Sequence, residues 1–126
     1  MGQLDPFFCK GLRVLLVEDE TIIAMLTEQM LREMGCDDVH IVGTVPMALS
    51  VIDRDPPDLA VLDVNLRGEL VTPVAEALRA RGVPFVLVSA YDRLDLVAPA
   101  LAGAPNVGKP FDEGHLLAAL TQAIAA

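Results

Sequence analysis

The sequence has few basic residues, and this shortage excludes one large class of partner. It carries 9 Lys and Arg residues against 18 Asp and Glu residues, for a net charge of −9 and a pI of about 4.4. Nucleic-acid binding depends on clustered Lys and Arg side chains that displace counterions from phosphates. The basic residues here are scattered, so we expect no nucleic-acid partner. An acidic surface suits a divalent cation or a basic protein partner.

Long apolar runs and leader features are also missing. No apolar stretch approaches the roughly 20 residues that a membrane-spanning helix needs. Residues 1–11 lack a basic region followed by an apolar one, so we expect a short N-terminal extension instead of a secretory signal, and one domain over residues 12–126. The nine glycines form neither a dinucleotide-binding motif nor a P-loop. We therefore expect a cytoplasmic protein that does not contact a membrane.

Cysteine is scarce. Cys9 and Cys36 have neither the spacing of a metal-binding pair nor a nearby pair of histidines. A disulfide between them remains an alternative, but two reduced thiols are the expected state, because disulfides are rare in the cytoplasm.

The pattern of apolar residues indicates an α/β fold. Hydrophobic residues make up 53% of the 126 residues, enough for the core of a single domain. Continuous apolar runs of strand length alternate with segments of helical period, and continuous runs are typical of strands buried on both faces of a parallel sheet. We expect strands at residues 13–17, 39–42, 59–62, 85–88 and 106–108.

Helical segments separate these strands. In the first of them, apolar residues at spacings of three and four form one stripe, made of Ile23, Leu26, Met30 and Met34. Met25 is expected to fill the core as well. Further helices are expected at residues 47–53, 71–81 and 112–125, and Pro99 makes residues 92–101 a short or irregular helix. Five β–α units predict one parallel sheet with helices on both faces.

Acidic side chains stand where two of the strands end. Glu18 and Asp19 follow the first strand, and Asp63 follows the third. Carboxyl ends of parallel strands line the crevice where such sheets bind ligands. Each pair of carboxylates at about 4 Å repels by roughly 4 kcal/mol at an effective dielectric near 20. Either one of them is protonated or a cation neutralises them, and Mg²⁺ suits oxygen ligands such as these and the backbone carbonyl of Asn65.

Asp63 is the candidate nucleophile of this site. A carboxylate can attack phosphorus to form an aspartyl phosphate, and phosphoryl transfer needs mainly positioning and charge neutralisation. Lys109 supplies a second cation, and Ser89 supplies a hydroxyl donor. Taken singly, each has an ordinary explanation, as a capping aspartate, a surface lysine or a strand-end serine. Together they favour a phosphoacceptor site.

Four motifs carry a family resemblance: VEDE at 17–20, LDVN at 62–65, SAY at 89–91 and KPF at 109–111. Their order and approximate spacing, over nearly the whole chain, resemble the receiver domain of two-component response regulators. The resemblance implies a flavodoxin-like three-layer sandwich, with a five-stranded parallel sheet of order 2-1-3-4-5 and five helices.

The resemblance also implies a metal-dependent phosphorylation. In receiver domains the residue matched by Asp63 accepts a phosphoryl group from a histidine kinase or a histidine phosphotransfer protein. The residue matched by Asp19 ligates Mg²⁺, that matched by Glu18 contacts it mostly through water, and the carbonyl matched by Asn65 completes the protein ligands. The implied protein is a phosphoacceptor switch and not an enzyme.

The switch itself is implied to involve two more residues. Lys109 would pair with the phosphate, with a cis bond to Pro110, and Ser89 would move toward the phosphate on activation. This movement would change the face formed by the fourth helix, the fifth strand and the fifth helix, where a downstream protein binds. Because no output domain follows in the sequence, we expect the output to be a protein surface.

Two features bear on this resemblance. The family usually has Tyr or Phe three residues before the lysine, where this chain has Asn106, so Tyr91 becomes the candidate mobile aromatic. Residues 83–91 are similar to a subgroup with a PFxFATGY-like motif, often stand-alone receivers of alphaproteobacteria.

Two other functions compete with a signalling switch. The chain could be a phosphate sink, which accepts phosphoryl groups without an output partner. It could also be an aspartyl-nucleophile phosphatase, but such enzymes need a second Asp two residues after the nucleophile as a general acid. Position 65 is Asn, which cannot donate a proton as a carboxylic acid does.

Overall fold

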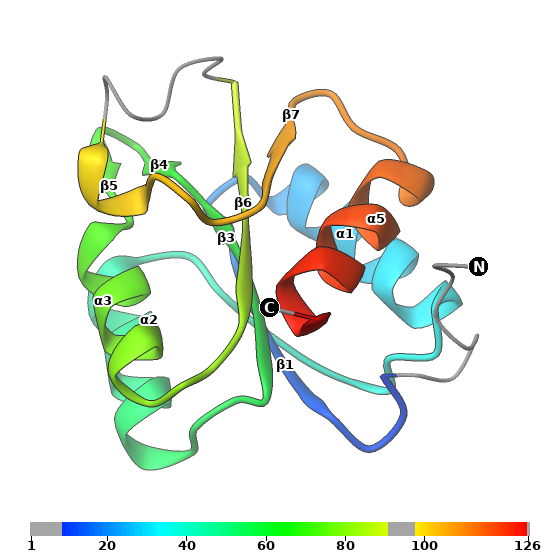
Figure 1. Ribbon diagram of the computed structural model, residues 1–126, viewed down its shortest axis with the longest axis horizontal. Helices are drawn as coiled ribbons and strands as arrows, with labels where there is room; N and C mark the ends of the chain where they lie inside the picture. The colour runs from blue at the N-terminus through cyan, green and yellow to red at the C-terminus, as the bar shows by residue number, and fades with distance from the viewer. Residues whose placement is uncertain (1–8, 91–97, 126) are drawn as a thin grey trace.

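A parallel sheet forms the centre of the computed structural model, which describes residues 9–90 and 98–125 (Figure 1). Its strands lie in the order β2-β1-β3-β6-β7, and all neighbours are parallel. Counted along the chain, this is the predicted order 2-1-3-4-5. The strands are β1 (Arg13–Val17), β2 (Asp38–Val42), β3 (Leu59–Asp63), β6 (Phe85–Ser89) and β7 (Asn106–Gly108).

Helices cover both faces of the sheet, as predicted (Figure 1). The helices α2 (Val45–Arg54) and α3 (Thr72–Ala80) pack on one face, and α1 (Thr21–Glu33) and α5 (Glu113–Ala125) pack on the other. The carboxylate of Asp112 accepts a hydrogen bond from the N–H of His115 (2.8 Å), which caps α5. Across residues 9–90 and 98–125, no helix is both long and apolar enough to cross a membrane.

The expected fourth helix is partly outside the described residues. Pro99–Leu101 forms η1, a single turn of 3₁₀ helix, in agreement with the expectation of an irregular segment. Tyr91 and the rest of residues 91–97 lie outside the part of the chain that the structure describes.

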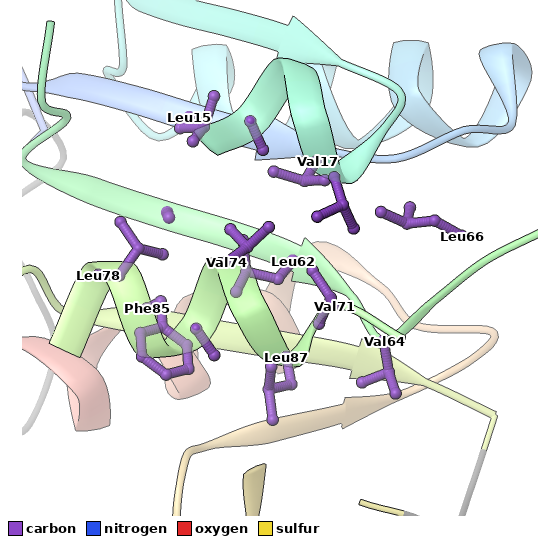
Figure 2. Packing of buried hydrophobic residues seen from close by; sticks show 14 of the residues in the cluster. Leu15, Val17, Leu62, Val64, Leu66, Val71, Val74, Leu78, Phe85 and Leu87 are labelled. Atoms are coloured by element: carbon purple, nitrogen blue, oxygen red, sulfur yellow. The ribbon is translucent and has the colours of Figure 1, made fainter. Parts of the chain in front are cut away.

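Two apolar layers fill the space between the sheet and the helices. Successive residues of β1 point to opposite faces, so Leu15 and Val17 pack toward α2 and α3, while Val14 and Leu16 pack toward α1 and α5. Figure 2 shows the first layer, where Leu78 lies among strand residues. Burial on both faces explains why the strand sequences are continuous apolar runs.

The helix α1 buries a stripe that matches the predicted one only in part: Met34 is buried and Met30 packs against the core, as expected. The buried side chains of the helix are Ala24, Thr27 and Leu31, and Met34, just beyond its end, is buried as well. Leu26 is half exposed and Met25 is 61% exposed, so the expectation that Met25 fills the core is wrong. The physical reason is Thr27, whose hydroxyl donates to the backbone carbonyl of Ile23 (2.8 Å) and is therefore satisfied in the core.

Cys9 and Cys36 form a disulfide, so the expectation of two reduced thiols is wrong. Both residues are buried, and the N–H of Gly11 donates to the carboxylate of Asp37 (3.2 Å) beside them. The partners are 27 residues apart, and the fold brings them together by returning the end of α1 to the start of β1. Cys9 thus belongs to the core, although the expected domain boundary before residue 12 stays a prediction.

A small hairpin between β3 and α3 was not predicted. It consists of β4 (Asn65–Leu66) and β5 (Glu69–Leu70), which pair antiparallel. Arg67 and Gly68 form its two-residue turn, with φ of 54° and 91°. A turn with both central φ values positive is the type that matches the twist of a hairpin.

Candidate functional site

The pairing of β1 with β3 brings three carboxylates together. Val17 lies opposite Leu62 in the sheet, so the residues that follow β1 stand beside Asp63 at the end of β3. Glu18, Asp19 and Asp63 each offer a carboxylate oxygen, and these oxygens lie within 4.8 Å of one another. Glu18 and Asp63 are buried and Asp19 is partly buried. The predicted acidic cluster is therefore present in the structure.

Lys109 brings a cation to this cluster from the edge of the sheet. Gly108 lies opposite Ser89, and the N–H of Lys109 donates to the carbonyl of Ser89 (2.9 Å). The Nζ atom of Lys109 lies 3.3 Å from an oxygen of Asp63 and 3.7 Å from an oxygen of Glu18. The peptide bond from Lys109 to Pro110 is cis, as the resemblance implied.

Burial controls the protonation of the two inner carboxylates. Burial, and after it the neighbouring charge of Asp63, raise the pKa of Glu18 to about 7. Burial also raises the pKa of Asp63, against the opposing effect of Lys109. Burial alone would lower the pKa of Lys109, but the charges of Asp63 and Glu18 outweigh this and raise it. The carboxylates thus lack enough positive charge nearby to be fully ionised, which is the condition that a bound cation relieves.

The cluster opens into a hollow of about 540 Å³ at the carboxyl end of the sheet. Ser89, which is buried at the end of β6, lines it together with Asp19, Asp63 and Lys109. The predicted nucleophile, hydroxyl donor and cation therefore share one space with the predicted metal ligands Asp19 and Asn65. Glu18 lies beside Asp63 and does not line the hollow. Asn106 lies apart from this hollow on β7, with an exposed side chain.

Asn65 holds the loop that follows the nucleophile. Its N–H donates to the carboxylate of Asp63 (3.4 Å), and its side-chain carbonyl accepts a hydrogen bond from the N–H of Gly68 (2.6 Å). These bonds place Asn65 at the rim of the hollow. Its backbone carbonyl as a metal ligand stays a prediction.

Arg67 is a site residue that the sequence reasoning missed. Its Nε donates to a carboxylate oxygen of Asp19 at 3.1 Å, and Arg67 lines the same hollow. A signal for its position was present, because Arg67-Gly68 between short apolar segments is a candidate two-residue turn. The contact with Asp19, 48 residues away, had no sequence signal.

The arrangement suits a divalent metal and a phosphoryl group. Three clustered carboxylates, of which those of Asp19 and Asp63 line the hollow, match the preference of Mg²⁺ for carboxylates, waters and a phosphate. Lys109 and Ser89 offer donors to phosphate oxygens. The site has no second carboxylic acid at position 65 to protonate a leaving group.

Comparisons with known proteins show the family to which the chain belongs. Residues 14–121 match the response regulator receiver domain family. The chain is 34% identical over 116 residues to the transcriptional regulatory protein PdtaR of Mycobacterium tuberculosis, covering 90% of this chain and 57% of PdtaR. It thus spans little more than half the length of that relative.

Two solved structures are similar over nearly the whole chain. One is SdrG from Sphingomonas melonis, with 37% identity, a TM-score of 0.77 and coverage of 98% of this chain and 100% of SdrG. The other is the receiver domain of the sensor histidine kinase PA1611 from Pseudomonas aeruginosa, with 28% identity, a TM-score of 0.77 and coverage of 92% and 99%. That structure holds a magnesium ion in its active-site cleft. The PFxFATGY-like subgroup stays a prediction.

The fold, the carboxylate cluster and these matches lead to one assignment. The family match covers well over half of the chain, and the sheet order is that of the receiver fold. The chain belongs to the receiver domain family of response regulators, the signalling switches of two-component systems.

Proposed function

We propose that this chain is the phosphoacceptor of a two-component phosphorelay and that Asp63 carries the phosphoryl group. The observation that supports this most is the meeting of three carboxylates within 4.8 Å, with the Nζ of Lys109 at 3.3 Å from Asp63. Asp63 belongs to this group and lines the hollow. Neither Glu18 nor Asp19 has the ammonium of Lys109 as close.

Mg²⁺ is the proposed cofactor, held by Asp19, Asp63 and the carbonyl of Asn65, with Glu18 in contact through water. The raised pKa of Glu18 supports this assignment, because burial and the neighbouring charge of Asp63 disfavour its ionised form, which a bound cation would favour. Bound Mg²⁺ would neutralise these carboxylates and draw charge from the oxygens of the transferring phosphoryl group.

The chain's own residues perform the transfer by positioning. An oxygen of Asp63 attacks the phosphorus of a phosphohistidine, and the new O–P bond forms as the P–N bond breaks. The imidazole leaves with the electron pair of that bond and takes up a proton. Lys109 pairs with the phosphoryl oxygens, and Ser89 donates a hydrogen bond to one of them. The protein acts as a phosphoacceptor and not as an enzyme with its own substrate turnover.

The phosphodonor is proposed to dock on α1. Ile22, Met25 and Leu26 are 73%, 61% and 50% exposed on this helix, and several exposed apolar side chains on one helix indicate an interaction surface. An apolar groove of about 300 Å³ runs from α1 to the loop after β7, lined by Ile23, Leu26, Thr27, Met30, Lys109, Pro110 and Phe111. Because Lys109 belongs to both the groove and the site, a helix of the donor seated there would bring its histidine to Asp63.

Phosphorylation is proposed to change the face of β7 and α5. Ser89 and Lys109 are joined by a backbone hydrogen bond of 2.9 Å, so a phosphate that draws both would move the ends of β6 and β7 together. A hollow of about 430 Å³ between β7 and α5, which includes Asn106 and His115, is the adjacent surface for a downstream protein. Tyr91 as the mobile aromatic belongs to the same proposal. A cytoplasmic location is proposed as well, although a disulfide such as that of Cys9 and Cys36 is uncommon there. A phosphate sink without an output partner is the alternative.

The experiment is phosphorylation by a small donor. The protein is incubated with Mg²⁺ and acetyl phosphate, and intact mass spectrometry should show the addition of one phosphoryl group. Asp63→Asn should abolish the adduct, whereas Asp53→Asn, at an exposed aspartate at the end of α2, should leave it unchanged. An adduct that survives in Asp63→Asn would overturn the assignment.

The docking face has a separate test. Leu26→Asp should slow transfer from a histidine phosphotransfer protein but leave labelling by acetyl phosphate at the wild-type rate. If Leu26→Asp slows transfer from both donors equally, the substitution damages the site itself. If Leu26→Asp and the wild type accept phosphoryl groups from the protein donor at the same rate, α1 is not part of the docking face.

A further inference from the structure

We propose that Arg67 competes with the divalent cation for Asp19 and so sets the metal affinity of the site. This inference rests on the proposed function, because it concerns the same metal site. In the structure the guanidinium of Arg67 holds the carboxylate of Asp19 at 3.1 Å. Asp19 is the carboxylate of the cluster that Lys109 does not contact within 4.0 Å.

The backbone at Arg67 is unusual for such a residue. Among residues 9–90 and 98–125, Arg67 is the one residue other than glycine that has a positive φ, and its value is 54°. This conformation is disfavoured for L side chains, and Asn, Asp or Gly are preferred at the first central position of such a turn. A long cationic side chain placed there against local preference indicates a role for the side chain itself.

Packing and hydrogen bonds hold the hairpin in a position from which the side chain of Arg67 reaches the site. The buried side chain of Leu66 fixes one strand in the core. The bond from the N–H of Gly68 to the side chain of Asn65 closes the turn at 2.6 Å. Asn65 itself donates to Asp63, so the turn is tied to the phosphoacceptor residue. The turn therefore places Arg67 in a defined position relative to both Asp19 and Asp63.

The two partners of this ion pair differ in exposure. The side chain of Arg67 is 81% exposed, whereas that of Asp19 is 10% exposed. The side chain of Arg67 can therefore move fully into solvent at little free-energy cost, while Asp19 stays in place to accept a metal. A weakly bound, exposed arginine is suited to displacement by a divalent cation. It balances the charge of Asp19 when no metal is bound, and it does not block the entry of the metal.

The consequence is a measurable competition. Removing the cationic side chain should raise the affinity of the site for Mg²⁺ by about two- to five-fold, the range expected for the loss of one solvent-exposed ion pair. The gain should shrink as salt rises, because both the pair and the repulsion between the two cations are screened.

The experiment measures Mg²⁺ binding in the absence of any phosphodonor, by calorimetric titration at low and high salt. The variants are Arg67→Gln, which removes the charge, and Arg67→Lys, which keeps it. Arg81→Gln is the matched control, since Arg81 is another arginine in an exposed pair, with Asp53 at 3.5 Å. We expect tighter binding in Arg67→Gln alone, and in the wild type a shift of the Arg67 Nε–H resonance as Mg²⁺ is added.

The outcomes separate this inference from the proposed function. Equal or weaker binding in Arg67→Gln, or an equal gain in Arg81→Gln, overturns the role of Arg67 while the metal site stands. If Mg²⁺ does not bind the wild type, or binds Asp19→Asn and Asp63→Asn as tightly as the wild type, the proposed metal site fails and this inference fails with it.

Discussion

The ammonium of Lys109 lies 3.3 Å from the carboxylate of Asp63, although β7, which precedes Lys109, and β3, which ends at Asp63, are not neighbours. The strand β6 separates them, and the long side chain of Lys109 spans its end. The same ammonium lies 3.7 Å from Glu18 at the end of β1. One cation therefore connects the ends of three strands, and its partners are two buried carboxylates.

Lys109→Ala should leave metal binding in place but weaken the response to a phosphate analogue. The remaining carboxylates still ligate Mg²⁺, but the analogue's oxygens lose their ammonium partner. With Mg²⁺ and beryllofluoride, amide shifts across residues 85–109 should appear only at much higher analogue concentration than in the wild type. Lys10→Ala, at an exposed lysine, is the control. Wild-type shifts at wild-type concentrations in Lys109→Ala would contradict the pairing.

Glu18 makes the stability of the metal-free protein depend on pH. Its pKa is raised from 4.5 to about 7 in the folded state, so the folded protein binds this proton more tightly than the unfolded chain. The stabilising contribution of this proton is complete below about pH 4.5 and is lost as the pH rises through about 7, a change on the order of 3 kcal/mol. Glu18→Gln stays neutral, so its advantage over the wild type should grow between pH 5 and pH 8.

Urea unfolding in the presence of EDTA measures this difference. Glu76→Gln, at an exposed glutamate of α3, controls for the loss of one charge. A Glu18→Gln advantage of the same size at pH 5 and pH 8 would show that Glu18 is not the titrating group.

The disulfide should contribute strongly to stability. It closes a loop between residues 27 positions apart, and cross-links of this size stabilise by about 3 kcal/mol through the entropy of the unfolded chain. The single variant Cys9→Ser and the double variant Cys9→Ser, Cys36→Ser should lose a similar amount of unfolding free energy, since each breaks the same bond. Reductant should bring the wild type down to the level of the variants in urea unfolding. A wild type that is insensitive to reductant would argue against the bond.

Leu78 and Leu26 allow a matched test of how α3 and α1 pack, because the first leucine is buried and the second is half exposed. Leu78→Ala removes a fully buried side chain from the layer under α3 and should cost about 3 kcal/mol of unfolding free energy. Leu26→Ala changes a half-exposed residue of α1 and should cost well under about 1 kcal/mol. Equal costs in thermal or urea unfolding would mean that α1 packs differently from the structure.

The sequence was sufficient for the sheet and for most of the site. Runs such as residues 59–62 are apolar throughout because both faces of the strand are buried, and this signal is local. Asp63 and Glu18 are recognisable for a related reason, since carboxylates are tolerated where a buried strand ends at a polar hollow. The expected clustering followed from strand order, and the structure agrees with it.

What the sequence alone determined is the set of parallel strands and the polar residues at their ends, because both are recorded in short stretches of the chain. Tertiary structure decided the disulfide of Cys9 and Cys36, the buried stripe through Thr27, the raised pKa of Glu18 and the reach of Arg67 to Asp19. Each of these depends on a distance between distant residues, or on a side chain satisfied by a particular neighbour. Periodicity and composition do not encode such distances, and the packed fold sets them.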